Sequence, residues 1–301
     1  MHNQNVLTLL FVVNPVSGGK EKNDWEASIC EHFKDKPHRI EFLLLTGKED
    51  EAAIRHQIAT IRPSRVVAVG GDGTVKMVAG LLRDTDLAMG IIPAGSANGM
   101  ARELNIPDDP NAALDIITDG SCKKLDLVSI NDKDICFHLS DMGLNAMLVK
   151  YFEQSGTRGM LGYARSVFRV LWGKKAIHAT IKTDAGEIRR TAFMIVIANA
   201  RTYGTGAIIN PKGRMDDGVF EVVVVRKVSI AEIFKMVVTH KPFNPKRTEI
   251  FQTKNLKLTT RRKAYFQVDG ELIGKVDSVE AHILPQSVFM MLPKEGTGTG
   301  F

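Results

Sequence analysis

Three glycines surround one acidic residue at positions 70–74, where the sequence reads Gly-Gly-Asp-Gly-Thr. Glycine has no Cβ atom, so the backbone of such a turn can come close to a bulky group, and its N–H groups favour negative charge. Asp72 would repel a bare phosphate, and it therefore favours a nucleotide bound together with a divalent cation. The alternative is that Asp72 only caps a helix and that the glycines only allow a tight crossover.

Two common phosphate-binding loops do not fit the sequence. The segment 14–21 lacks the first glycine and the final Ser or Thr of the Walker pattern, and the segment 71–76 lacks the third glycine of GxGxxG. The residues therefore predict neither a Walker loop nor a standard dinucleotide fingerprint.

A second glycine-bearing turn, at 93–98, carries the Ser96 hydroxyl and the Asn98 amide. In an open α/β sheet, ligands gather beyond the carboxyl ends of the strands. We therefore expect the turns at 14–20, 70–74 and 93–98 to line one crevice. Ser96 and Asn98 could equally be helix-capping residues.

Two acidic clusters follow in the second half of the chain, Asp216-Asp217-Gly218 before a predicted strand and Asp269-Gly270-Glu271 after one. Position by position, the simplest interpretation is a pair of type I′-like Asp-Gly turns. Aspartate beside glycine is common, so each cluster alone does not predict a site.

The turn at 70–74 needs a strand before it and a helix after it. The run 66–69 is short, apolar and β-branched, as in a parallel strand buried on both faces, and the apolar residues of 75–82 repeat at helical spacing. The same alternation extends over the first half of the chain. The predicted strands are 6–13, 40–45, 66–69 and 88–92, and the predicted helices are 24–36, 49–61, 75–82 and one that starts at Asp109-Pro110 and stops near Gly120.

The pattern changes after this last helix, because short strands and turns dominate. The predicted strands are 125–130, 135–139, 177–183, 187–200, 219–225, 249–258, 263–268 and 279–284, with a capped helix at 229–239. We therefore predict an α/β fold class, in which a parallel-sheet nucleotide-binding domain over 1–124 is followed by an antiparallel β-sandwich domain over 125–301.

The composition is that of a globular protein, since 44% of the 301 residues are hydrophobic and 25% are charged. The net charge of +6 favours anionic partners, but it is too small to indicate nucleic acid. Cys30, Cys122 and Cys136 are odd in number and lack metal-binding spacing, which favours a reducing, cytoplasmic location. No apolar run approaches the roughly 20 residues of a membrane span, and no HxxxH or GxSxG motif is present.

The segment 158–172 forms a basic amphipathic pattern when it is projected on a helix. Arg158, Arg165 and Arg169 lie on one side, and apolar residues lie opposite. Such a helix could rest on a membrane surface, or it could pack on its own domain.

Five short motifs occur in order over nearly the whole chain. They are Asn14-Pro15-x-Ser17-Gly18, Gly70-Gly71-Asp72-Gly73-Thr74, Pro93-x-Gly95-Ser96-x-Asn98-x-x-Ala101-Arg102, Asp217-Gly218 and Asp269-Gly270-Glu271. Together they resemble the diacylglycerol kinase catalytic family, which includes bacterial soluble lipid kinases, sphingosine kinases and ceramide kinases. The resemblance implies a nucleotide-binding α/β domain, a β-sandwich domain and an active site in the cleft between them. It also implies that the last strand, at 288–292, returns to the first domain.

The resemblance further implies the roles of individual residues, with ATP and Mg²⁺ as the bound groups. Glu271 matches the position of the family's proton acceptor, a role that Asp72 could share. Asp217 matches the position of a ligand of a structural magnesium ion. The backbone carbonyls of Arg214 and Val219 would complete that magnesium site. Apart from the resemblance, phosphoryl transfer needs charge neutralisation, for which the N–H groups of the turn at 70–74 and Lys20 are candidates. The implied ATP contacts are Thr46, Gly70, Gly71, Asp72, Gly73, Thr74, Val75, Lys76 and Ser96, with Asn14, Ser17 and Asn98 lining the same cleft.

The sequence departs from the family pattern at two positions. Ser96 replaces the usual threonine, and Gly99 stands where many members have aspartate. The second change resembles the sphingosine and ceramide kinase branch, so the acceptor lipid is open between diacylglycerol and a sphingoid base.

The predicted function is that of an ATP-dependent lipid kinase of lipid metabolism or phospholipid biosynthesis. The predicted location is cytoplasmic, with the inner membrane face as a peripheral site and a homodimer left open. The alternatives are a kinase of a soluble acceptor such as NAD and a non-catalytic protein that binds a nucleotide or a lipid.

Overall fold

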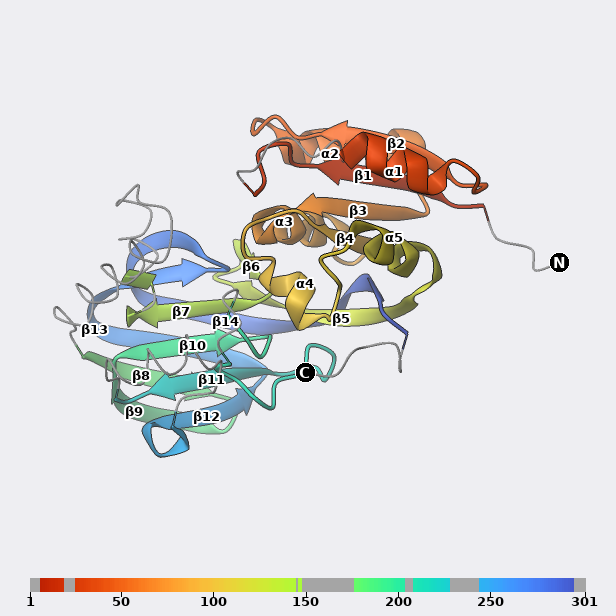
Figure 1. Cartoon of the computed structure of the whole chain (residues 1–301). Coiled ribbons are helices and arrows are strands. Elements are labelled where there is room, and N and C mark those ends of the chain that lie inside the picture. The colour runs from red at the N-terminus through yellow and green to blue at the C-terminus, as the bar shows by residue number, and fades with distance from the viewer. Residues whose placement is uncertain are drawn as a thin grey trace. The chain divides into compact units, whose positions relative to one another are not determined.

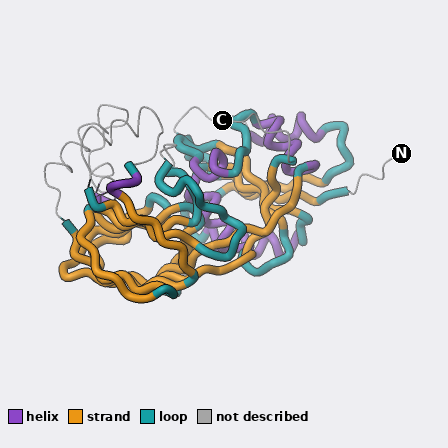
Figure 2. Tube along the Cα trace, turned by 90° about the horizontal axis from the view of Figure 1, so that it is seen from below, coloured by secondary structure: helices purple, strands orange, loops and turns teal. Residues whose placement is uncertain are grey.

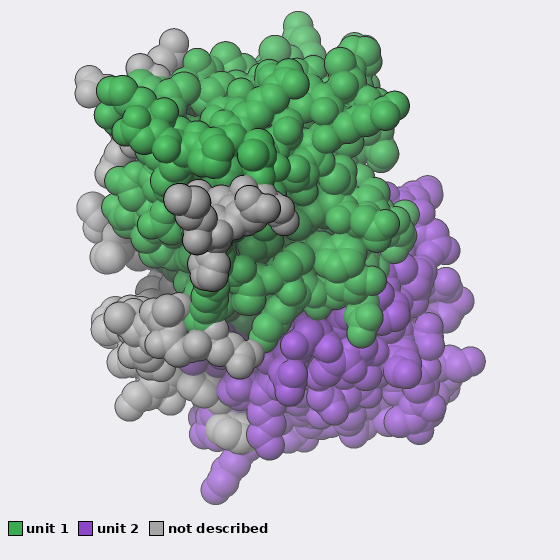
Figure 3. Space-filling view, turned by 90° about the vertical axis from the view of Figure 1, so that its right-hand side faces the viewer, with its two compact units in different colours: residues 1–125, 286–301 green, residues 126–285 purple. Residues whose placement is uncertain are grey.

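The computed structural model describes residues 6–18, 25–144, 146–147, 176–203, 208–227 and 244–294. The chain divides into two compact units, one made of 1–125 with 286–301 and the other of 126–285 (Figure 3). Within the described residues, no helix is long and apolar enough to cross a membrane. The predicted helices 158–172 and 229–239 lie outside the described residues, as do Lys20 and residue 24.

The first unit is a parallel sheet whose strands alternate with helices (Figure 1). The strands lie in the middle of this unit because a run without polar side chains can be covered on both faces. In β3, for example, residues 66–69 are fully buried. The sheet order is β2-β1-β3-β4, and the end of β14 pairs with β4 in parallel. The elements are β1 (Thr8–Val13), α1 (Trp25–Phe33), β2 (Arg39–Leu44), α2 (Asp50–Ile61), β3 (Arg65–Gly70), α3 (Asp72–Leu82), β4 (Ala88–Pro93), α4 (Gly99–Glu103) and α5 (Pro110–Asp119).

Helix α5 begins and ends where the sequence predicts. The Asp109 carboxylate accepts a hydrogen bond from the Ala112 N–H at 2.8 Å, and Pro110 occupies the first helical position. Helix α3 begins earlier than predicted, at Asp72, because the Gly71 carbonyl already accepts from the Val75 N–H at 3.1 Å. The glycine turn is therefore itself the first turn of α3.

The second unit is built from antiparallel strands that curve around and enclose a core (Figure 2). The order β12-β11-β10-β7-β13-β14 is antiparallel at each step, and β9 joins β13 through β8. Strands β5 and β14 each run from one unit into the other. The elements are β5 (Ser121–Ile130), β6 (Asp134–Cys136), β7 (Leu139–Gly143), β8 (Ile177–Thr183), β9 (Gly186–Ala192), β10 (Met194–Ala198), β11 (Phe220–Val225), β12 (Thr248–Thr253), β13 (Asn255–Val268) and β14 (Glu271–Leu292), with a short 3₁₀ helix at Pro245–Arg247.

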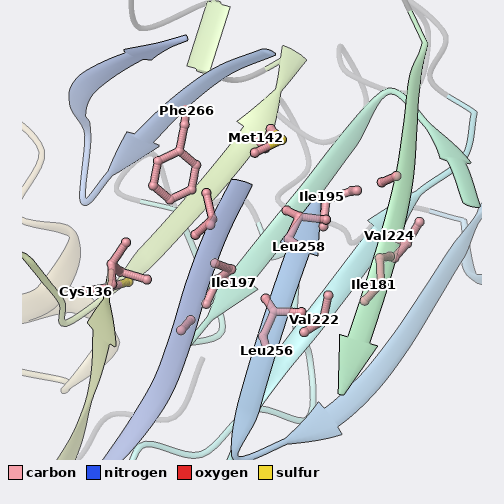
Figure 4. Close-up of a cluster of buried hydrophobic side chains, with 14 of the residues drawn as sticks. Cys136, Met142, Ile181, Ile195, Ile197, Val222, Val224, Leu256, Leu258 and Phe266 are labelled. Carbon is pink, nitrogen blue, oxygen red and sulfur yellow. The ribbon is translucent and has the colours of Figure 1, made fainter. Parts of the chain in front are cut away.

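The core of the second unit contains apolar side chains from almost all of these strands (Figure 4). On β8 they alternate with outward-facing residues, so that every second residue is buried, whereas β7, β10 and β11 are buried along their whole length. The predicted α/β fold class, with a parallel sheet followed by an antiparallel β-sandwich, is confirmed. The labelled residues in the figure are Cys136, Met142, Ile181, Ile195, Ile197, Val222, Val224, Leu256, Leu258 and Phe266.

Three predicted strands of the second unit divide into two. The run 135–139 divides after Cys136, because the N–H groups of the next two residues donate to the Asp269 carboxylate. The run 187–200 divides at Phe193, whose N–H donates to the Val225 carbonyl at 2.9 Å instead of continuing the pairing with β8. The run 249–258 divides at Lys254, because its N–H donates to the Asp184 carboxylate at 2.6 Å. Conversely, 255–268 is one strand with a bulge, and 279–284 belongs to the long strand β14.

Candidate functional site

Three turns of the first unit converge beyond the carboxyl ends of its strands, as predicted. The Asn14 amide donates to the Thr74 hydroxyl at 3.2 Å, which joins the first turn to the second. The Ala94 N–H donates to the Gly70 carbonyl at 2.9 Å, which joins the second turn to the third. Ser17 lies in the first turn, where its N–H donates to the Asn14 carbonyl at 3.2 Å. The sequence therefore places these polar residues at one edge of the sheet.

The second and third turns pack backbone against backbone. A Cβ atom added to Gly95 would lie 2.4 Å from the Cα of Gly71, well inside any ordinary contact. Only glycine allows this approach. The pentapeptide at 70–74 and the turn at 93–98 therefore form one compact surface.

Asp72 points from the second turn into the third. Its two carboxylate oxygens accept hydrogen bonds from the N–H groups of Gly99 at 3.0 Å and Met100 at 2.9 Å. The residue therefore caps α4, and not the helix that it begins. Because each carboxylate oxygen has two lone pairs, these bonds leave acceptor positions on both oxygens. A hard cation such as magnesium prefers such oxygen ligands.

Asn98 does not cap α4 with its side chain. Its Oδ1 accepts from the Gly95 N–H at 2.8 Å, which holds the third turn closed, and its backbone is left-handed with φ of 50°. Ser96 is exposed on the same turn. The helix-capping interpretation is therefore wrong for Asn98.

The other residues implied as ATP contacts differ in what they expose. The side chains of Thr74 and Val75 are buried, at 4% and 3% exposure, so only their backbone groups could meet a ligand. Gly73 is exposed, and Lys76 is partly buried. Thr46 lies in the connection between β2 and α2, where its N–H donates to the Asp50 carboxylate at 2.9 Å. If Thr74 and Val75 contact a ligand, they therefore do so through backbone groups.

The turn at 269–271 in the second unit joins β13 to β14. Asp269 and Gly270 have φ of 49° and 87°, which fits the predicted type I′ turn. The Asp269 carboxylate accepts from three successive N–H groups, at 2.8 to 3.0 Å, of residues 137–139. Asp269 is therefore an anchor of the turn, and Glu271 is the exposed acid beside it.

The buried side-chain amide of Gln267 stabilises the same turn by hydrogen bonding. Gln267 is 1% exposed, and its Oε1 accepts from the Gly270 N–H at 2.6 Å. Its Nε2 donates to the carboxylate of Asp141, which is fully buried on β7. Sequence reasoning missed both residues, although Gln267 is the polar member of the short run 265–268.

The turn at 216–218 is not of type I′, because only Gly218 has positive φ, at 73°. Asp217 is exposed, and its carboxylate accepts from the Val219 N–H at 3.3 Å. The fully buried carboxylate of Asp126 accepts from the Gly218 N–H at 2.7 Å. Sequence reasoning also missed Asp126, which interrupts the apolar start of the strand predicted at 125–130.

No three His, Cys, Asp or Glu side chains form a metal-binding group in the described part of the chain. The Arg214 guanidinium bonds Asp216, at 3.1 Å, and this leaves Asp217 outside that ion pair. The exposed Asp217 carboxylate is a hard oxygen ligand of the kind that magnesium prefers, since magnesium keeps several water ligands beside it.

A buried acid lies close in sequence to this turn, on β11. Glu221 is 2% exposed, and its carboxylate accepts from Asn210 Nδ2 at 2.6 Å and Gln252 Nε2 at 3.0 Å. Burial raises the pKa of Glu221, and the two amide donors oppose that rise. Asn210 Oδ1 has no partner among the described residues.

Comparison with known proteins gives the same two parts. Residues 8–130 match the model of the diacylglycerol kinase catalytic domain, and residues 140–292 match that of the YegS C-terminal NAD kinase beta sandwich-like domain. A Chromohalobacter salexigens protein named as a probable lipid kinase, YegS-like, is 26% identical over 77% of this chain and 76% of its own length. A Staphylococcus aureus diacylglycerol kinase is 26% identical over 91% of this chain and 90% of its own length.

The fold is shared with solved structures. The crystal structure of a diacylglycerol kinase from Bacillus anthracis superposes with a TM-score of 0.72, over 96% of this chain and 97% of that one, at 18% identity. At this identity the likeness concerns the fold.

Proposed function

This chain belongs to the diacylglycerol kinase catalytic family, a family of lipid kinases, and from that membership we propose that it is an ATP-dependent lipid kinase. It would transfer the γ-phosphoryl group to a hydroxyl of a lipid such as diacylglycerol or a sphingoid base. The observation that supports the proposal is the meeting of three glycine-bearing turns, with Asp72 oriented among them.

The triphosphate of ATP would lie on the backbone surface of the turns at 70–74 and 93–98. Gly73 and Ser96 are exposed there, and N–H groups at the start of α3 favour negative charge. Thr46, Lys76, Asn14 and Ser17 would line the edges of the same site. A magnesium ion held by Asp72 would neutralise the terminal phosphates.

Glu271 would act as the general base. In the transfer, the lipid hydroxyl oxygen forms a bond to the γ-phosphorus, the bond from that phosphorus to the β–γ bridging oxygen breaks, and ADP leaves. The proton of the lipid hydroxyl goes to the Glu271 carboxylate. The exposure of Glu271, at a turn fixed by Asp269 and Gln267, supports this role.

A structural magnesium ion would be held by the Asp217 carboxylate and the backbone carbonyls of Arg214 and Val219. It would fix the turn at 216–218 beside β11. Because its acceptor is a lipid, the protein would work as a cytoplasmic, peripheral protein at the inner membrane face.

The test is the variant Glu271→Gln, with Glu280→Gln as the control on the same strand. We expect turnover of radiolabelled ATP with diacylglycerol or sphingosine to fall by about 10²- to 10⁴-fold in Glu271→Gln, as for other general bases. ATP affinity should be unchanged, and the control should keep full turnover. Unchanged turnover in Glu271→Gln would refute its assignment as the base.

A kinase of NAD is the second candidate, because the matched second domain is described as NAD kinase beta sandwich-like. NAD is therefore included as an acceptor in the same assay. Label that appears only in NADP would refute the lipid proposal.

A further inference from the structure

The outer face of the second unit contains a surface pocket of about 380 Å³ over strands β8, β9 and β13. The residues that line it include His178, Thr180, Arg189, Thr191, Thr259 and Arg261. The strand pattern explains why these side chains face outward. On β8 the alternate residues 177, 179 and 181 are buried in the core, so 178 and 180 point to the other face.

The strand register brings these side chains together. Arg189 of β9 pairs with Thr180 of β8, and Thr180 pairs with Thr259 of β13. One row across three strands therefore contains a guanidinium and two hydroxyls. The next outward pair, Thr191 and His178, is joined by a hydrogen bond of 3.0 Å.

A bulge in β13 adds a basic segment at the rim of this pocket. Thr259 pairs with Ser278 of β14, and the next paired residue, Ala264, meets Val276. The extra residues include Arg261, Arg262 and Lys263, which are all exposed. A bulge re-aims the side chains that it carries, so this basic run is displayed at the surface.

The charges of the pocket are only partly compensated. Arg190 is paired with Glu249 at 2.8 Å, but among the described residues the acidic partner of Arg189 is only the exposed Glu187, at 3.9 Å. Arg261 makes no ion pair with any residue that the structure describes, and the lining contains no Asp or Glu. The hydroxyls of Thr180 and Thr259 likewise have no hydrogen-bond partner in the described ranges. Within the described residues, the pocket therefore offers more cationic groups and donors than acidic partners.

We propose that this pocket binds a phosphate group, as a second anion site built entirely from the second unit. Two guanidinium groups and flanking hydroxyls match the acceptor oxygens of phosphate in charge and geometry. The volume is in the range of small-ligand sites, so it has room for a phosphate together with a glycerol-sized group. The ligand is a phosphate ester, either the headgroup of an anionic lipid or a free one.

The proposal goes beyond the kinase function and does not depend on it. None of the residues involved belongs to the turns at 70–74 or 93–98, or to the turn at 269–271. Phosphate binding and lipid phosphorylation can therefore be measured separately, and the failure of one would leave the other unaffected.

The test uses the full chain and the double variant Arg189→Gln/Arg261→Gln. Binding is measured by calorimetry with glycerol 3-phosphate, and by sedimentation with phosphatidylcholine vesicles that do or do not contain phosphatidylglycerol. A basic residue near an anionic surface strengthens binding by about fivefold, so we expect a loss of about 25-fold. The control is Arg55→Gln/Arg83→Gln, which removes two exposed arginines from the first unit and therefore has the same net charge as the pocket variant.

The two probes distinguish the sources of the phosphate. Loss of binding to phosphatidylglycerol vesicles in the pocket variant alone identifies a lipid headgroup. Loss of glycerol 3-phosphate binding with unchanged vesicle binding identifies a free ester. The proposal is overturned if the parent protein binds neither probe, if the pocket variant binds both as the parent does, or if the control loses as much as the pocket variant.

Discussion

Gly73 offers a direct test of where the nucleotide phosphates lie. It is exposed in the first turn of α3, and a Cβ atom added to it would meet no heavy atom within 4 Å. The variant Gly73→Ala should therefore fold without strain. Because alanine loses less conformational freedom than glycine on folding, we expect the free energy of unfolding to stay the same or to rise by up to about 1 kcal/mol.

In the proposed nucleotide site, the same methyl group would compete with phosphate oxygens for the space beside the N–H groups of the turn. A hydrogen bond to a charged group contributes about 1.5–3 kcal/mol, so the loss of one such bond would weaken ATP binding by about 10- to 150-fold. The expected result is thus an unusual combination, in which a variant is as stable as the parent but binds ATP poorly.

The assay is titration calorimetry with ATP and magnesium, together with urea unfolding of the same samples. Ser28→Thr, which adds one methyl group to an exposed position of α1, is the control and should bind ATP like the parent. If Gly73→Ala binds ATP as tightly as the parent, the phosphates do not lie on this turn. The proposed nucleotide site would then be wrong.

Three further predictions test the packing and the charges. In Gly95→Ala, the new Cβ would lie 2.4 Å from the Cα of Gly71, about 1 Å short of the 3.4 Å at which ordinary contact begins, so urea unfolding should show a loss of about 1–3 kcal/mol. Asp184 accepts from Asn255, Lys254 and Thr253, which lowers its pKa from 3.8 to about 2, so its stabilising effect is complete above about pH 4 and is lost as the pH falls toward 2. Asp184→Asn should thus lower the free energy of unfolding by about 1 kcal/mol at pH 7, allowing for the exposure of Asp184 to solvent. In unfolding curves from pH 5 to 2, the variant should not show the acid-dependent loss of stability that the parent shows. Equal pH dependence in both proteins would contradict the assignment. Burial raises the pKa of Glu221, so the parent gains stability as the pH falls through that raised value. Glu221→Gln should remove this pH dependence and should change the free energy of unfolding little at pH 7, because Asn210 Oδ1 can accept from the new amide. A large loss of stability at pH 7 would contradict this reasoning.

The sequence predicts the fold best where local chemistry decides. The short β-branched run 66–69 is typical of a strand buried on both faces, and Asp109-Pro110 fixes the start of a helix without help from elsewhere. The meeting of the three turns also follows from the sequence, because parallel strands bring their carboxyl ends to one edge of the sheet.

The sequence fails where a distant residue decides. The strand over 249–258 is broken by Asp184, which lies about 70 positions earlier in the chain and takes the N–H groups of Lys254 and Asn255. Likewise, the pentapeptide does not reveal that Asp72 caps α4, because its partners lie 27 and 28 positions away. Asp126 was missed for the same reason, since the Gly218 N–H that it accepts lies 92 positions later in the chain.

The end of β14 has a consequence for how this protein is synthesised. Phe289 and Met290 pair with Ala88 and Met89 of β4, so a strand from the far end of the chain closes the sheet of the first unit. While the ribosome is still making the second unit, β4 has a bare edge of unpaired N–H and C=O groups, which is a template for association with other chains. Contacts between residues so far apart in sequence also form slowly. A nascent chain that stalls before residue 286 should therefore be the form most in need of chaperones.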